Sequence, residues 1–180
     1  MERALVERAR SGDRAAFDDL VRSRIDAVYR TSLAIVGDRG DAADATQETF
    51  VSAWCHRAAL REPDSFDAWL GRISLNACRR QLRRRGRTRV REIRLVDPED
   101  EREPASPERA LDDRTADADV FDRAFARLSV DDRAVLVLHH FQERPVAEIA
   151  AVLGAPAGTI KSRLHRARAA LESALTKEAR

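Results

Sequence analysis

Residues 145–175 read PVAEIAAVLGAPAGTIKSRLHRARAALESAL. Apolar residues recur here at the three- and four-residue intervals of one helix face, in two blocks that Gly154-Ala155-Pro156 separates. The first block is Val146, Ile149, Ala150 and Leu153, and the second is Ile160, Leu164, Ala167 and Leu171. A short helix, a glycine turn and a longer helix are typical of the helix-turn-helix, so this stretch predicts a small helical domain.

The polar face of the second predicted helix is strongly basic. Its side chains able to bond to DNA are Thr159, Lys161, Ser162, Arg163, His165, Arg166 and Arg168. Hydroxyl groups near a helix N-terminus suit backbone phosphates, and arginine suits the paired acceptors of guanine. We therefore expect this basic face to read duplex DNA.

The composition favours an all-α fold. The 180 residues include only 7 glycines and 6 prolines, and long amphipathic segments dominate the chain. Upstream of the helix-turn-helix, VFDRAFARL (120–128) and DDRAVLVLHHFQ (131–142) predict two further helices. These segments together predict a C-terminal domain over residues 120–176.

The first 85 residues predict a bundle of about four helices. The shortest covers residues 2–10, and the next ends at Gly37, because glycine commonly terminates helices. The apolar stripe of this second helix is Phe17, Leu20, Val21, Ile25 and Val28. We expect a domain of residues 1–85 with that stripe in its core.

The third helix, expected over residues 41–58 with Asp41 as its N-cap, has two distinct faces. Its sequence DAADATQETFVSAW (41–54) places four side chains on one side that can be buried: Thr46, Phe50, Ala53 and Trp54. Another face, which also carries Val51, gathers three polar side chains: Asp44, Gln47 and Glu48. Such a face is either a solvated surface or a binding stripe for another protein.

The fourth helix is expected from Phe66 to about Arg85, after a loop at residues 59–66. Its polar side becomes basic along its length, because nine of the sixteen residues from Arg79 to Arg94 are arginine. Five side chains form a row that suits phosphates and base edges: Arg72, Asn76, Arg79, Arg80 and Arg83. This arginine row indicates nucleic-acid binding, with a solvated basic helix end as the alternative.

Residues 86–119 have the composition of a flexible acidic linker. From Asp97 to Asp119 there are ten acidic residues against three arginines, together with three prolines. These 34 residues would span about 32 Å as a relaxed coil and about 110 Å when fully extended. An acidic tether is also able to imitate nucleic acid toward basic surfaces.

Several function classes lack the residues that they need. Cys55 and Cys78 are too few for a disulfide framework and match no zinc spacing, and there is no nucleophile motif or glycine-rich phosphate loop. We therefore predict no metal, no cofactor and no enzymatic activity. Since no apolar run approaches the length of a membrane span and the N-terminus lacks a signal core, we expect a cytoplasmic protein.

Three stretches carry a resemblance to one family: DAADATQETFVSAW (41–54), FDAWLGRISLNACRRQLRR (66–84) and EIAAVLGAPAGTIKSRLHRARAAL (148–171). In these residues, their order and their separation, the chain resembles the extracytoplasmic-function, or group IV, sigma factors of bacterial RNA polymerase. The resemblance implies that residues 1–85 are sigma region 2 and residues 120–176 sigma region 4, joined by the linker 86–119.

By this resemblance, the residues that dock on the clamp helices of the largest subunit of core RNA polymerase would be Asp44, Gln47 and Glu48. The chain would also contact the flap of the polymerase. The arginine row would follow the non-template strand of the minus-10 element, beside a base captured by the loop 59–66. The basic face would read the minus-35 element, about two helical turns or roughly 70 Å away. The resemblance also implies an anti-sigma factor as a partner, and no obligate homo-oligomer is expected.

Two other classes of protein remain open on the residues alone. A stand-alone helix-turn-helix regulator needs only the C-terminal domain and leaves the polar stripe of the third helix without a role. A helical adaptor that binds only proteins leaves both basic surfaces unexplained. Strict dependence of DNA binding on core polymerase separates the sigma factor from both.

Overall fold

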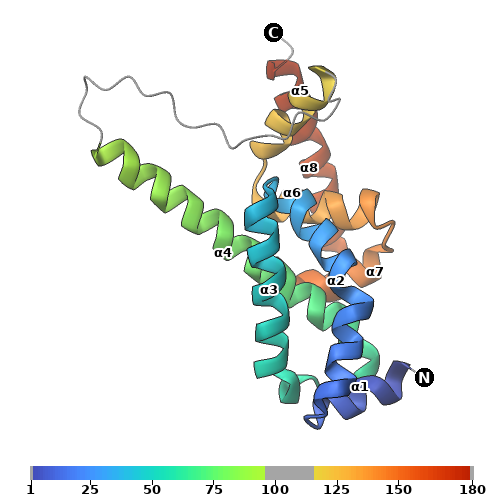
Figure 1. Cartoon of the computed structure of the whole chain (residues 1–180). Coiled ribbons are helices and arrows are strands. Elements are labelled where there is room, and N and C mark those ends of the chain that lie inside the picture. Colours follow the sequence, from blue (N-terminus) through green and yellow to red (C-terminus); the bar gives the residue numbers. More distant parts are fainter. Residues whose placement is uncertain (1, 96–115, 179–180) are drawn as a thin grey trace.

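The computed structural model describes residues 2–95 and 116–178, and within these ranges the chain is helical without any strand (Figure 1). The predicted all-α fold is confirmed, and residues 96–115 of the predicted linker lie outside the described residues. The N-terminal part contains α1 (Glu2–Arg10), α2 (Arg14–Val36), α3 (Arg39–Cys55) and α4 (Phe66–Leu95), with 3-10 turns at Arg57–Ala59 and Pro63–Ser65. The C-terminal part contains α5 (Ala116–Ala126), α6 (Val130–Leu136), a π-helical turn (Val137–Phe141), α7 (Val146–Leu153) and α8 (Ala157–Glu178).

Local capping residues explain where α2 and α3 begin and end. The Asp13 carboxylate caps the first turn of α2, and Gly37 ends that helix as predicted, in the left-handed conformation with φ of 75°. The prediction of Asp41 as the next N-cap is wrong, because α3 begins at Arg39 and Asp38 is its cap. Asp41 lies instead in the first turn, where burial and the nearby Asp38 raise the pKa of its carboxyl.

The N-terminal core draws on α1, α2, α3, the loop and α4. Its buried apolar side chains include Val6, Leu20, Val28, Phe50, Leu60, Phe66 and Leu70. The expectation that Ile25 belongs to this core is wrong, because its side chain is 41% exposed. In this stretch α2 buries Ala16, Leu20 and Val28, which are four and eight residues apart. Ile25 lies one residue, or about 100° of helix rotation, past the position that continues this line between Leu20 and Val28.

The fourth helix is longer than predicted. It continues past Arg85 to Leu95, since Gly86 lies inside α4 and does not terminate it. Arginine is a good helix former, and one glycine in a helix interior costs only about 1 kcal/mol relative to alanine. Neither α4 nor any other helix in the described ranges is both long and apolar enough to cross a lipid bilayer.

The helix-turn-helix predicted at the C-terminal end is present. Gly154 closes α7 with φ of 63°, a conformation that glycine adopts without strain, and α8 starts three residues later at Ala157. The core of this part is built from both helices together with α5 and α6. Its most deeply buried members include Val135, Ile149, Val152, Ile160 and Ala167.

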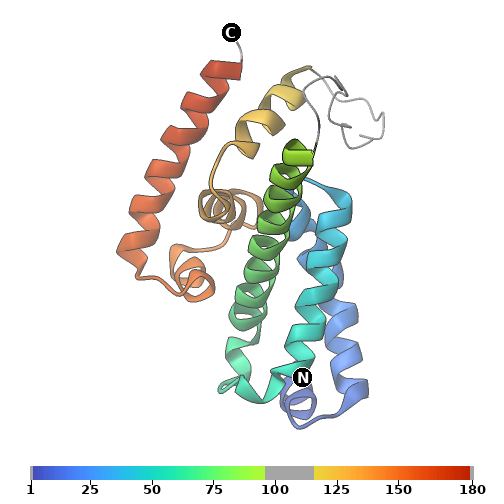
Figure 2. The same ribbon diagram turned by 90° about the vertical axis from the view of Figure 1, so that its left-hand side faces the viewer.

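The two parts of the chain pack against each other (Figure 2). In this packing, α6 contacts α2 and α4, and α7 contacts α4. One core cluster is shared: Ile35 of α2 and Leu75 of α4 are buried together with Ala134 of α6 and Val137 of the π-helical turn. We call this packing of the C-terminal part on α2 and α4 the closed arrangement.

Candidate nucleic-acid and protein-binding surfaces

On α3, two of the three predicted docking residues are open to a partner. Asp44 and Gln47 are exposed, and Val51 on the same face is 57% exposed. Glu48 turns toward α4, where Arg80 Nε donates a hydrogen bond of 2.6 Å to Glu48 Oε1. The other carboxylate oxygen, Oε2, is buried without a hydrogen-bond partner among the described residues. This stripe is therefore tied at one point to the arginine row of α4.

Small side chains on the opposite side of α3 let the helix approach α2 and α4 closely. Its buried residues are Ala42, Ala45, Thr46, Thr49, Phe50 and Ala53. Of the four side chains expected in the core, Trp54 is only half-buried, with the ring of Phe17 at 5.1 Å and the Arg57 guanidinium over its face at 4.2 Å. Because the buried face is so regular, the polar stripe of α3 is held in a fixed orientation.

The loop between α3 and α4 buries its three largest apolar side chains. Leu60 and Phe66 are each 5% exposed, and Pro63 is buried between them in sequence. Arg10 of α1 donates a hydrogen bond of 2.8 Å from Nη1 to the carbonyl of Arg61. The loop is thus fastened to the bundle, and its polar residues face outward.

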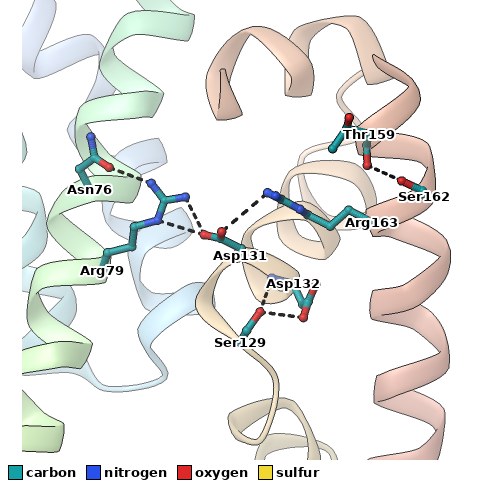
Figure 3. A network of polar contacts seen from close by, with 8 residues as sticks. All are labelled: Asn76, Arg79, Ser129, Asp131, Asp132, Thr159, Ser162 and Arg163. Carbon is teal, nitrogen blue, oxygen red and sulfur yellow. Dashed lines mark hydrogen bonds and ion pairs between the residues drawn. The ribbon is translucent and has the colours of Figure 1, made fainter. Parts of the chain in front are cut away.

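Much of the arginine row of α4 is already bound to protein (Figure 3). Arg72 Nη2 donates a hydrogen bond of 2.7 Å to the carbonyl of Ala151 in α7. Arg79 donates to Asp131 Oδ1 from Nε at 3.0 Å and from Nη2 at 2.6 Å, and to Asn76 Oδ1 from Nη1 at 2.9 Å. The C-terminal part of the chain therefore holds two members of the row directly and Asn76 through Arg79.

The remaining two members of the row differ from each other. Arg80 is bound to Glu48 of α3, within the N-terminal part. Arg83, one turn further along α4, is exposed. The five residues of the row therefore have three different surroundings: the C-terminal part of the chain, Glu48 of α3 and solvent.

The basic face of α8 is mostly open to solvent. Its exposed members are Thr159, Lys161, Ser162, His165, Arg166 and Arg168. Ser162 Oγ donates to the Thr159 carbonyl at 3.0 Å within the first turns of the helix. Arg163 is the exception: its side chain is only 21% exposed, and its Nη1 lies 3.8 Å from Asp131 Oδ2.

A histidine holds one further arginine of this face. Arg168 Nε donates a hydrogen bond of 3.2 Å to His140 Nε2, which must be unprotonated to accept it. Burial, helped by the nearby charge of Arg168 and by His139, lowers the pKa of His140. The hydrogen bond from Arg168 requires a neutral His140 ring, and the lowered pKa of His140 favours that form.

Two residues of α6 that the sequence did not single out connect the two parts. Asp131 bonds to arginines from α4 and α8, as described above. Arg133 is 8% exposed and donates to the carbonyls of Leu128 and Ile35, each at 3.1 Å, and to that of Ala126. Burial lowers the pKa of this guanidinium, which still bonds to carbonyls from α2 and from the end of α5. A basic residue directly before the apolar run AVLVL (134–138) was the sequence signal of this role.

The described residues offer no metal-binding cluster. Across residues 2–95 and 116–178, no three His, Cys, Asp or Glu side chains converge as ligands would. Cys55 is exposed at the end of α3, and burial raises the pKa of the Cys78 thiol inside the bundle.

Family comparison assigns each part of the chain to a known region. Residues 20–88 match the family described as Sigma-70 region 2, and residues 118–171 match Sigma-70, region 4. The first match covers α3 and most of α2 and α4, and the second covers most of the stretch from α5 to α8.

Relatives and solved structures agree with this assignment. The chain is 38% identical over 174 residues to the ECF RNA polymerase sigma factor SigE of Mycolicibacterium smegmatis, covering 93% of this chain and 65% of that protein. It is 33% identical over 181 residues to the RNA polymerase sigma-H factor of Pseudomonas aeruginosa, covering 97% and 93%. Its structure is similar to CnrH in complex with the cytosolic domain of CnrY, with a TM-score of 0.67, 29% identity and coverage of 98% and 97%. It is also similar to the sigma factor RpoE in complex with the anti-sigma factor NepR from Bartonella quintana, with a TM-score of 0.63, 28% identity and coverage of 89% and 96%.

Proposed function

This chain belongs to the sigma-70 family of RNA polymerase sigma factors, and we propose that it acts as an extracytoplasmic-function sigma factor. It binds core RNA polymerase and directs promoter-specific initiation through the minus-35 and minus-10 elements. One observation carries this proposal: regions 2 and 4 occur in order in one chain. Synthesis of RNA remains the chemistry of the polymerase, so the chain itself has no catalytic role.

The functional division proposed along the chain follows these two regions. Residues 1–85 dock on core polymerase and handle the minus-10 element, residues 86–119 form the linker, and residues 120–176 read the minus-35 element. The family matches to residues 20–88 and 118–171 support this division. A stand-alone regulator would leave the whole match to region 2 without a purpose.

The docking surface proposed for polymerase is the polar stripe of α3. Asp44 and Gln47 project from a helix whose other side is packed into the bundle, so they are free to meet the clamp helices of the largest polymerase subunit. The ion pair with Arg80 limits the rotamers of Glu48, which lies beside Asp44 and Gln47 on the same helix. Region 4 contacts the flap of the same enzyme.

The two DNA surfaces proposed are the arginine row of α4 and the basic face of α8. The row suits a single strand, because guanidinium groups neutralise phosphates and Asn76 is able to bond to a base edge. The face suits a major groove, because Arg166 and the hydroxyl groups at the start of α8 are exposed on one side of a helix.

An anti-sigma factor is the further partner proposed. One solved structure similar to this chain, over 89% of its length, is the sigma factor RpoE in complex with the anti-sigma factor NepR, and this likeness supports such a partner. Since its polymerase and promoter partners occur in the bacterial cytoplasm, we place the chain there too.

Co-purification with core RNA polymerase tests the proposed function. Wild-type chain should elute with the polymerase, and the triple variant Asp44→Ala/Gln47→Ala/Glu48→Ala should lose this binding while it remains helical and folded. The reason is that the variant removes the polar stripe of α3 and leaves its buried face unchanged.

A matched control removes the same negative charge elsewhere. Asp18 and Asp26 are exposed on α2, so Asp18→Ala/Asp26→Ala eliminates two carboxylates, as the triple variant does, and should still bind. Wild-type chain that ignores the polymerase but binds duplex DNA alone would contradict the sigma factor proposal and favour a stand-alone regulator.

A further inference from the structure

The first helix, α1, lies at the end of the bundle where α3 is joined to α4 (Figure 1). It packs on α2 and contacts both 3-10 turns of the loop that follows α3. The match to sigma region 2 begins only at residue 20, so α1 lies outside it. The surfaces proposed above for polymerase and DNA lie on α3, α4 and α8, and none of them gives α1 a role.

The last residue of α1, Arg10, holds the irregular middle of this loop. Residues 60–62 connect the two 3-10 turns, with Leu60 and Glu62 in extended conformations. Arg10 Nη1 donates to the carbonyl oxygen of Arg61 at 2.8 Å and to that of Leu60 at 3.4 Å. One guanidinium from another helix therefore fixes two consecutive peptide groups of the connection.

Apolar contacts join α1 to the same loop. Val6 and Ala9 are 2% and 3% exposed, and they share one core cluster with Leu60 and Phe66. Together with Arg10, these four side chains line one hollow between the helix and the loop. Because this packing does not involve the guanidinium, the loop stays attached to the bundle when Arg10 is replaced. Only the path of its backbone becomes free to vary.

Ion pairs fasten the second half of the loop and the start of α4. Arg3 Nη1 of α1 donates to Asp64 Oδ2 at 2.8 Å. Arg24 of α2 donates to Asp67 Oδ1 at 2.9 Å and also to Glu2 at the start of α1. The side chains of Arg3 and Asp64 are 59% and 68% exposed, so solvent screens this pair and its contribution is small.

Four polar residues of the loop are exposed and able to meet a DNA strand. They are Arg61, Glu62, Asp64 and Ser65. A pocket that reads an unstacked base through hydrogen bonds needs its groups held within about 0.5 Å of the productive position. Loops hold such groups less precisely than helices do, unless neighbouring elements fix them. The contacts from α1 supply that support here.

We propose that α1 shapes the loop 59–66 for base capture, with Arg10 as a positioning residue for recognition of the minus-10 element. The inference rests on the proposed function, because it takes this loop to receive an unstacked base. Arg10 acts through the carbonyls of Leu60 and Arg61 and not through a contact of its own with DNA. Base selectivity then depends on a helix that lies outside the region 2 match.

Hydrogen exchange in the free chain tests the clamp. The amides of Leu60 and Ser65 are hydrogen-bonded within the two turns, so they report on the loop. Arg10→Ala should raise their exchange rates at least tenfold, whereas the amides of α2, α3 and α4 keep theirs.

The matched control for this variant is Arg8→Ala. It removes the same charge from the same helix, and Arg8 bonds to Asp13 at the start of α2 instead of to the loop. Its loop should exchange at the wild-type rate. Unchanged loop exchange in Arg10→Ala, or an equal rise in both variants, would overturn the clamp.

Base selectivity of the holoenzyme tests what the clamp is for. Wild-type chain with core RNA polymerase is used to select sequences from a pool of randomised single-stranded DNA, and abasic substitution then identifies the captured position. Arg10→Ala should reduce the preference at that position about tenfold. The slope of log affinity against log salt should stay unchanged, because the phosphate contacts of α4 are untouched. A uniform loss at every position, or a changed slope, would overturn the positioning role.

The conservative variant Arg10→Lys separates charge from geometry. Lysine keeps the positive charge but lacks the planar fork of donors, so it should restore only part of the preference and part of the loop protection. Full restoration of the preference with a loop that still exchanges fast would attribute the effect to charge and overturn the inference.

A failure of the proposed function has a different signature. If the wild-type holoenzyme selects no base at any position, the proposed handling of the minus-10 element fails, and the inference falls with it. Loop exchange is measured without polymerase and DNA, so loss of the clamp and loss of the proposed function are distinguishable.

Discussion

The arginine row of α4 and the basic face of α8 look alike in the sequence but differ in how much of each is already bound to protein. In the row, Arg72 and Arg79 donate to the C-terminal part and Arg80 to Glu48. On the face, most side chains are exposed, and Arg163 is the one drawn inward. Most basic side chains of the face on α8 are therefore available to a ligand, whereas most side chains of the row on α4 already bind protein groups.

In the closed arrangement the basic face of α8 is exposed, whereas α6 and α7 hold three members of the row: Arg72, Arg79 and, through Arg79, Asn76. The following predictions are ordered from the largest expected effect to the smallest.

Substitution of Arg166 should have the largest effect. This side chain is exposed on the basic face, so Arg166→Ala should weaken minus-35 recognition by about 1–3 kcal/mol if it bonds to guanine. Arg163→Ala should cost less in net affinity, because it also removes one contact to Asp131. Equilibrium binding to duplexes with intact and altered minus-35 elements measures both. Equal losses on the two duplexes would instead identify phosphate contacts.

Substitution of Gly71 should have an intermediate effect by weakening the closed arrangement. Gly71→Ala places a methyl group 3.3 Å from two atoms of Val152, so either Val152 shifts or α7 moves away. We expect the affinity for a single-stranded minus-10 oligonucleotide to rise severalfold, which a titration with labelled strand measures.

The control for this variant is Gly86→Ala. Gly86 lies in the same helix with nothing within 4 Å of its Cβ position, so this change adds about the same helix propensity, about 1 kcal/mol, without touching α7. Equal increases in strand affinity for both variants would attribute the effect to helix stability and contradict the role of closure.

Substitutions at neighbouring positions of the row should have the smallest and most distinct effects. Arg80→Ala removes the partner of Glu48 and should weaken polymerase docking by about 0.5–1 kcal/mol. Arg83→Ala should leave docking unchanged and reduce the slope of log affinity against log salt for the single strand by about 0.7. Holoenzyme assembly and salt titrations measure the two effects. Identical behaviour of both variants would show that the row acts as one surface.

Much of the fold was predictable because helices depend on local pattern. The 3.6-residue period of the apolar stripes and the glycines at Gly37 and Gly154 predicted the helices of both parts and the helix-turn-helix. Errors arose where local signals compete: Asp38 and Asp41 are both able to cap, and the fourth helix, expected to end at about Arg85, continues through Gly86 to Leu95. Ile25 was misplaced because it lies at the edge of the apolar stripe, away from the line of residues that α2 buries.

The sequence by itself determined which residues share a helix face: the polar stripe of α3, the arginine row of α4 and the basic face of α8. Only the tertiary structure decided which of these side chains are available, since that depends on contacts between residues far apart in the chain. Arg79 and Asp131 are 52 positions apart, and Arg72 and Ala151 are 79 apart. Periodicity reports the direction of a side chain from its own helix, but the partner that it meets is set by how the helices pack.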